Sequence, residues 1–75
     1  MLYIYNVLFI GKQGAKNIVF KHLNIKENEA KKIDISFDYE SGLWEYNVEF
    51  IYNNLEYDYI IDAKNGDIIL HQIDK

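Results

Sequence analysis

The chain has 75 residues, with 12 acidic against 8 basic residues, a formal net charge of −4 and no cysteine. This length corresponds to one small domain, and the lack of cysteine excludes a disulfide framework or a cysteine-based zinc site. Every basic residue is a lysine. The acidic balance excludes nucleic acid as a partner, because phosphate binding needs a basic surface.

The first ten residues form an apolar segment, interrupted only by Asn6. No lysine precedes it and no small-residue cleavage site follows it, so it does not resemble a signal peptide, and it is too short to span a bilayer. We therefore divide the chain into an apolar N-terminal arm, residues 1–10, and a domain, residues 11–75. The arm is expected to pack beside the helix of its own domain or to pair with an edge strand, either its own or that of a second copy in a homodimer.

A helix is predicted over residues 12–23. Its apolar stripe has the three-and-four spacing of one helix face and consists of Ala15, Ile18, Val19, His22 and Leu23. Asn24 is expected to end the helix in the left-handed conformation, which asparagine tolerates. The start is weaker, because Gly11 is a poor cap and Lys12 lies at the positive end of the helix dipole.

Three turn signals divide residues 33–73 into four strands. Ser41-Gly42, Asn53-Asn54 and Asn65-Gly66 are each typical of a two-residue hairpin turn. With these turns, one face of the sheet carries Ile33, Ile35, Phe37, Tyr39, Trp44, Tyr46, Val48, Phe50, Tyr57, Tyr59, Ile61, Ala63, Ile68 and Leu70. This face is apolar throughout, and a one-residue slip would move half of these side chains away. The predicted fold is therefore α+β, with one α-helix packed on a four-stranded antiparallel β-meander.

The opposite face of the predicted sheet is acidic. Its rows are Asp38, Glu45, Asp62 and Ile69; then Ser36, Asn47, Ile60 and His71; then Asp34, Glu49, Asp58 and Ile73. Three interpretations stay open: a solvated surface, a docking surface for a basic protein partner, or cation binding. The candidate partner-binding face consists of Asp34, Asp38, Glu45, Glu49, Ile51, Asp58, Ile60, Asp62 and Ile69.

The residue pattern predicts no catalytic group, no cofactor and no metal site. His22 and His71 are expected to lie apart, on the helix and on the acidic face, and no serine-histidine-acid spacing accompanies them. Asp62–Asp67 is similar to the start of a calcium loop, but Lys64 occupies a ligand position and the later glutamate is missing. We therefore expect a protein that is not an enzyme.

The most distinctive stretch is the run of strands and turns from Leu43 to Leu70. It contains an aromatic and acidic strand ending near Asn53-Asn54, followed by Glu-Tyr-x-x-Ile-x-Asp-Ala-x-x-Gly-x-Ile at residues 56–68. This stretch resembles the core of PepSY domains, which occur in pro-regions of secreted peptidases and in cell-envelope proteins. The resemblance implies a non-catalytic binding module that regulates or inhibits a peptidase partner, in a secreted or cell-envelope setting.

A second interpretation is a self-associating structural or interaction module of a cell-envelope protein. It is motivated by the apolar arm and by sheet edges that no proline guards.

Overall fold

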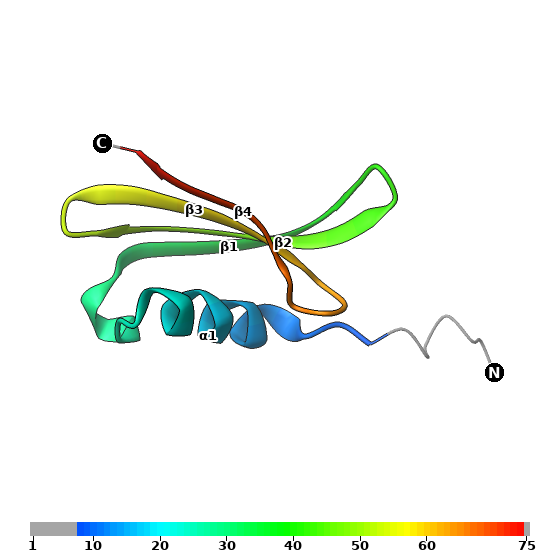
Figure 1. Cartoon of the computed structure of the whole chain (residues 1–75), viewed down its shortest axis with the longest axis horizontal. Helices are drawn as coiled ribbons and strands as arrows, with labels where there is room; N and C mark the ends of the chain where they lie inside the picture. The colour runs from blue at the N-terminus through cyan, green and yellow to red at the C-terminus, as the bar shows by residue number, and fades with distance from the viewer. Residues whose placement is uncertain (1–7, 75) are drawn as a thin grey trace.

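The computed structural model describes residues 8–74 and confirms the predicted α+β architecture. Its elements are α1 (Gly11–Leu23), a short 3-10 helix (Glu27–Glu29), β1 (Lys31–Glu40), β2 (Leu43–Tyr52), β3 (Leu55–Asp62) and β4 (Ile68–Asp74). The strands form one antiparallel sheet in the order β1-β2-β3-β4. The helix lies along one face, and the β1–β2 hairpin projects past the start of the helix (Figure 1).

The first two hairpins have the predicted turns and register. Ser41 and Gly42 have φ of 51° and 84°, and Asn53 and Asn54 have φ of 53° and 63°. Positive φ at both central residues matches the right-handed twist of the strands, so these turns set the pairing without help from the rest of the molecule. Glu40 pairs with Leu43, and Tyr52 pairs with Leu55.

The predicted two-residue turn at Asn65-Gly66 is wrong, because β3 and β4 are joined by residues 63–67. One oxygen of the Asp62 carboxylate accepts hydrogen bonds from the backbone N–H of Lys64 at 2.8 Å and of Asn65 at 3.2 Å. The side-chain oxygen of Asn65 in turn accepts from the N–H of Asp67 at 2.9 Å. These side chains replace hairpin hydrogen bonds and stabilise a longer loop.

A β-bulge changes which face the later β4 side chains occupy. Ile61 pairs with Ile68 but Ile60 pairs with Leu70, so Ile69 is an extra residue in a β-bulge. As a result Leu70 lies on the acidic face rather than in the predicted core. His71, predicted on the acidic face, pairs with Tyr59 on the helix side, and Ile73 likewise pairs with Tyr57.

The core lies between α1 and the central strands. Its buried members are Ala15, Val19, Phe20, Tyr46, Val48, Phe50, Tyr57, Tyr59, Ile61 and Ala63. The helix stripe is confirmed at Ala15 and Val19, and Phe20 joins it by packing edge-on against Phe50 with ring centroids 5.2 Å apart. At 20–33 cal/mol per Å² of apolar area removed from water, each fully buried side chain of this kind contributes about 1.5–3 kcal/mol.

The helix ends as predicted, and its start lacks the usual capping interactions. Asn24 adopts φ 59° and ψ 46°, and its N–H bonds back to the last turn. No side chain caps the start and no acidic residue lies in the first turn. Instead, the N–H of Ile10 donates to the carbonyl of Ala63 at 2.8 Å, which ties the entry of the helix to the end of β3.

Part of the predicted N-terminal arm contributes to the core. Phe9 packs against Phe37 and Trp44, with ring centroids 5.1 Å and 5.7 Å apart, and Ile10 packs against the buried cluster. Leu8 is 79% exposed. The rest of the arm, and hence the prediction of its edge pairing, falls outside the described residues.

Candidate functional site

The acidic face of the sheet contains both predicted rows of carboxylates. Asp34 pairs with Glu49, which pairs with Asp58, and Asp38 pairs with Glu45, which pairs with Asp62. Because neighbours in an antiparallel sheet bring side chains on one face within about 5 Å of each other, each row is a line of like charges.

The row between the two carboxylate rows is polar at its centre. The side-chain amide of Asn47 donates both to the carboxylate of Asp58 and, at 3.1 Å, to the backbone carbonyl of Tyr59. The hydroxyl of Ser36 donates to the carboxylate of Asp38 at 3.3 Å. These hydrogen bonds orient one carboxylate in each row without neutralising its charge.

Glu45, in the middle of its row, has a raised pKa. Burial is the main effect that raises the pKa of Glu45, and the negative charges of Glu40 and then Asp38 add to it. Within residues 8–74 the structure has one ion pair, Lys16 with Glu27 at 2.8 Å, and it lies on the helix side. The acidic rows are therefore not screened by lysine contacts in the described part of the chain.

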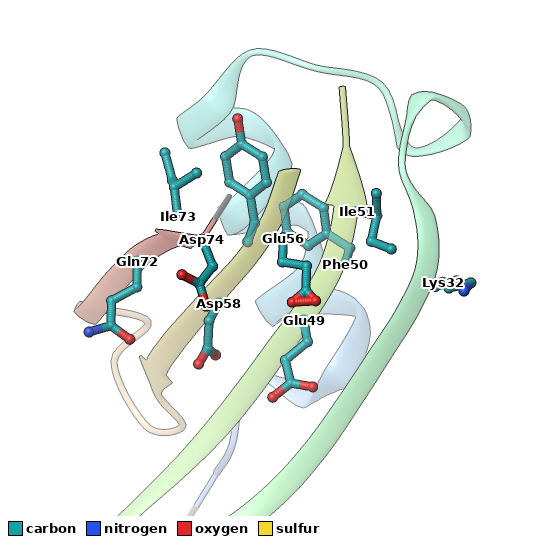
Figure 2. A pocket seen from close by; sticks show the side chains of 10 residues that line it. Lys32, Glu49, Phe50, Ile51, Glu56, Asp58, Gln72, Ile73 and Asp74 are labelled. Atoms are coloured by element: carbon teal, nitrogen blue, oxygen red, sulfur yellow. The ribbon is translucent and has the colours of Figure 1, made fainter. Parts of the chain in front are cut away.

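An open hollow of about 630 Å³ lies at the end of the sheet that carries the N-terminal half of β3. Its acidic lining residues are Glu49, Glu56, Asp58 and Asp74. Figure 2 shows these side chains over β2, β3 and β4, while Lys32 at the other side of β1 points away from them. Glu56 and Asp74 were absent from the predicted face. Glu56 lies there because it pairs with Ile51 in the predicted β2–β3 register, whereas Asp74 lies there through its pairing with Glu56, which exists only in the observed β4 register.

The apolar residues of the predicted face are only partly where they were expected. Ile51 pairs with Glu56, and Ile60 lies in the row of Asn47. Ile69 is not in the Asp62 row, because the bulge removes it from the ladder, and it is 46% exposed. Leu70 takes a place beside Ile60 instead. Ile60 and Leu70 are therefore adjacent on this face, whereas Ile51 lies on the far side of the Asp34–Glu49–Asp58 row.

The two histidines, predicted to lie apart, meet at one residue. The Nδ1 atom of His22 lies 2.8 Å from the hydroxyl of Tyr59, and the ring of His71 stacks on Tyr59 with centroids 4.4 Å apart. The prediction was wrong because it did not include the β-bulge at Ile69, which moves His71 to the helix side of the sheet. An Asp at the strand end with an Asn three residues later was the signal that could have revealed the longer loop.

The described residues offer no metal centre. No group of three or more histidine, cysteine or acidic side chains within residues 8–74 is arranged to hold a metal ion. The carboxylate of Asp62 accepts hydrogen bonds from backbone N–H groups of its own loop. What the acidic face can do chemically is attract and orient a positively charged surface.

In the described part of the chain, no helix has the length and apolarity to cross a membrane. The longest, α1, has 13 residues, and six of them carry charged, histidine or amide side chains: Lys12, Gln13, Lys16, Asn17, Lys21 and His22.

Comparison with known proteins supports the resemblance noted from the sequence. The family model PepSY, described as peptidase propeptide and YPEB domain, matches residues 10–71. A relative described as "Uncharacterized protein Spy1430", from Streptococcus pyogenes serotype M6, is 35% identical over 60 residues. That match covers 80% of this chain and 46% of the relative, so the chain spans about half the length of its curated relative. No solved structure matches.

Proposed function

Because the chain belongs to the PepSY family, we propose that it is a binding module that regulates or inhibits a secreted or cell-envelope peptidase through the acidic face of its sheet. PepSY domains are generally non-catalytic propeptide or regulatory modules and are usually extracellular or envelope-associated. The proposal assigns this chain the same setting and a peptidase as its partner.

The observation that carries the proposal is the arrangement of acidic side chains. Six carboxylates in two rows are aligned by the register of β1, β2 and β3. Two more, Glu56 and Asp74, extend them along the hollow. Aligning like charges costs stability, and burial with neighbouring acids already raises the pKa of Glu45. A basic partner surface would relieve this repulsion on binding. The free energy that the repulsion costs the free domain would then contribute to the affinity for the partner.

The apolar side chains on the same face fit this role. Ile51, Ile60 and Leu70 are half-buried in the free domain; Ile60 and Leu70 lie between the two acidic rows, and Ile51 lies beyond the row that contains Glu49. A partner that covers the face would desolvate them together with the carboxylates. This combination of apolar centre and charged surround is common in protein interfaces.

An inhibition assay tests the proposal directly. The full chain is titrated into assays of secreted peptidases from the organism that encodes it, at low and at high salt. We expect one of them to be inhibited, and inhibition to weaken as salt screens the acidic face. The double variant Asp38→Lys/Glu49→Lys should weaken inhibition, because both side chains are exposed and lie in different rows. Asp62 is left unchanged because its carboxylate holds the β3–β4 loop.

The matched control is Glu27→Lys/Asp67→Lys, which makes the same change in net charge away from the acidic face. Equal loss of inhibition in the two double variants would mean that only net charge matters and would reject the acidic face as the docking surface. Absence of inhibition of every peptidase would reject the proposed function.

A further inference from the structure

The outer edge of β1 differs from the rest of the sheet. β1 is a terminal strand, and within residues 8–74 no strand pairs with its outer side. Among the described backbone hydrogen bonds that lie outside the strand ladders, none involves β1. The ladder with β2 is regular from Asp34 to Glu40, after the bulge that follows Lys31. The edge is therefore regular over seven residues, without a bulge.

The register of the hairpin determines which backbone groups face outwards. In a two-residue hairpin the residues that flank the turn, Glu40 and Leu43, exchange hydrogen bonds, and the bonded pairs then recur at every second residue. The N–H and C=O groups of the intervening residues, Ile35, Phe37 and Tyr39, therefore point away from β2. They are the groups that an added strand would bind.

The two faces of this edge differ sharply in chemistry. On the helix side, Phe37 is 38% exposed and Tyr39 is 57% exposed. Both pack on Trp44, which stacks on Phe37 at 5.1 Å and contacts Tyr39 at 4.7 Å, so the aromatic surface is already ordered. On the other face the same strand presents Asp34, Ser36, Asp38 and Glu40. An apolar surface and an acidic surface thus flank one line of free backbone groups.

This pattern selects the partner. A second copy of β1 fits poorly in the register that pairs the whole edge with itself: with Phe37 opposite its copy in an antiparallel pairing, Asp34 would face Glu40 of the other chain, and like charges opposite each other are destabilising. An extended strand in which apolar residues alternate with lysine or arginine does fit, because one set of side chains meets the aromatic surface and the other meets the acids.

We propose that the outer edge of β1, from Asp34 to Glu40, binds an extended partner segment with alternating apolar and basic residues by adding it to the sheet as a fifth strand. The proposal rests on the proposed function only in that it treats the chain as a binding module, and it supplies the mode of recognition. Backbone hydrogen bonds to Ile35, Phe37 and Tyr39 provide affinity, and the two side-chain surfaces provide specificity.

The single tryptophan of the chain, Trp44, lies in the aromatic surface and reports on binding by fluorescence. The probe is a capped synthetic peptide, Lys-Val-Lys-Val-Lys-Val-Lys. The control peptide has the same composition in the order Lys-Lys-Lys-Lys-Val-Val-Val. We expect saturable binding of the alternating peptide and binding weaker by roughly fivefold or more for the control, which has the charge without the alternation.

Three variants locate the site. Asp38→Lys should weaken binding roughly threefold or more, whereas Asp67→Lys, an equal charge change at an exposed position of the β3–β4 loop, should change it less than about twofold. Tyr39→Pro removes an N–H that faces away from β2, so it should reduce binding without removing a hydrogen bond of the sheet. On peptide addition, the amides of Ile35, Phe37 and Tyr39 should become protected from hydrogen exchange.

Several results would overturn the proposal. These are equal weakening by Asp38→Lys and Asp67→Lys, protection that appears on β4 instead, or amides at Ile35, Phe37 and Tyr39 that are already protected in the free chain. The last result would mean that a segment of this chain or a second copy occupies the edge. No peptidase takes part in these measurements, so their failure leaves the proposed function standing, and a failed inhibition assay leaves the edge site standing.

Discussion

The Nδ1 atom of His22, in the last turn of α1, lies 2.8 Å from the hydroxyl oxygen of Tyr59, in the middle of β3. Tyr59 is fully buried, and His71 of β4 stacks on its ring. One tyrosine thus joins the helix, a central strand and an edge strand. The contact fixes the C-terminal end of the helix over the β3–β4 side of the sheet.

Removing this hydroxyl should destabilise the domain. Tyr59→Phe removes one hydrogen bond, while the exposed His22 can still reach water, so we expect a loss of about 0.5–1.5 kcal/mol in the free energy of unfolding. Urea unfolding followed by circular dichroism measures it. Tyr57→Phe is the matched control, since Tyr57 is similarly buried and makes no side-chain hydrogen bond among the described residues. An equal loss in both variants would assign the effect to the ring environment rather than to His22.

The domain should lose stability at high pH through the same tyrosine. Burial, with a smaller contribution from Tyr57, raises the pKa of Tyr59 from 10.0 to about 12. Between these values the unfolded chain releases the phenolic proton while the folded chain retains it, so stability falls as pH rises through this window. Unfolding free energies measured across this range should show the fall. Tyr59→Phe should show a smaller fall, and an identical slope in the variant would contradict the assignment.

Neutralising Glu45 should stabilise the domain at neutral pH. Because the folded pKa of Glu45 is raised above 4.5, its contribution to stability is present below that pH and is lost as pH rises through the folded pKa. Glu45→Gln should therefore raise the melting temperature at pH 7, and the gain should vanish in acid. Added salt should reduce the part of the gain due to Glu40 and Asp38, leaving the part due to burial. A variant less stable than the parent at pH 7 would show that the carboxylate is favourable in its place.

Gly66 should tolerate a side chain less well than Gly42, because its backbone conformation and the nearby Ile18 both disfavour an added Cβ. Its φ is +81°, and an added Cβ would lie 2.9 Å from the Cδ1 atom of Ile18 on the helix. Gly42 has a similar φ of +84° but its Cβ would meet only the Tyr39 hydroxyl, at 3.9 Å. Both alanine variants should lose about 1 kcal/mol or more from backbone strain, and Gly66→Ala should lose more. Ile18→Val in the Gly66→Ala background should recover part of the difference; thermal melts of the four proteins decide.

The two faces of β2 should respond oppositely to charge. Val48 is fully buried beneath the helix, so Val48→Asp should unfold the domain or cost several kcal/mol. Glu49, the next residue, is exposed between Asp34 and Asp58, so Glu49→Lys should be neutral or stabilising. Circular dichroism melts compare them. Similar damage from both changes would be inconsistent with the register of β1, β2 and β3.

Local chemistry was sufficient for the helix end and the first two hairpins. Positive φ is adopted at Asn24, Ser41-Gly42 and Asn53-Asn54, where the local residue types favour turns. A two-residue turn then sets the register of the whole strand pair that it joins. This is why both rows of carboxylates, from Asp34 and from Asp38, could be aligned from the sequence. The helix stripe was largely predictable for the same reason, since helical spacing alone places Ala15 and Val19 on one face.

The sequence by itself therefore determined the fold class, the faces on which the side chains of β1, β2 and β3 lie, and the acidic face. Only the tertiary structure decided β4. The Asn65-Gly66 pair is compatible with a short turn, but the side chains of Asp62 and Asn65 bind the loop backbone, and Gly66 must approach Ile18 of a helix about 48 residues earlier in the chain. The resulting bulge at Ile69 moves His71 beneath His22 and Leu70 onto the acidic face. No local propensity encodes that choice, because it is settled by packing between segments that are distant in sequence.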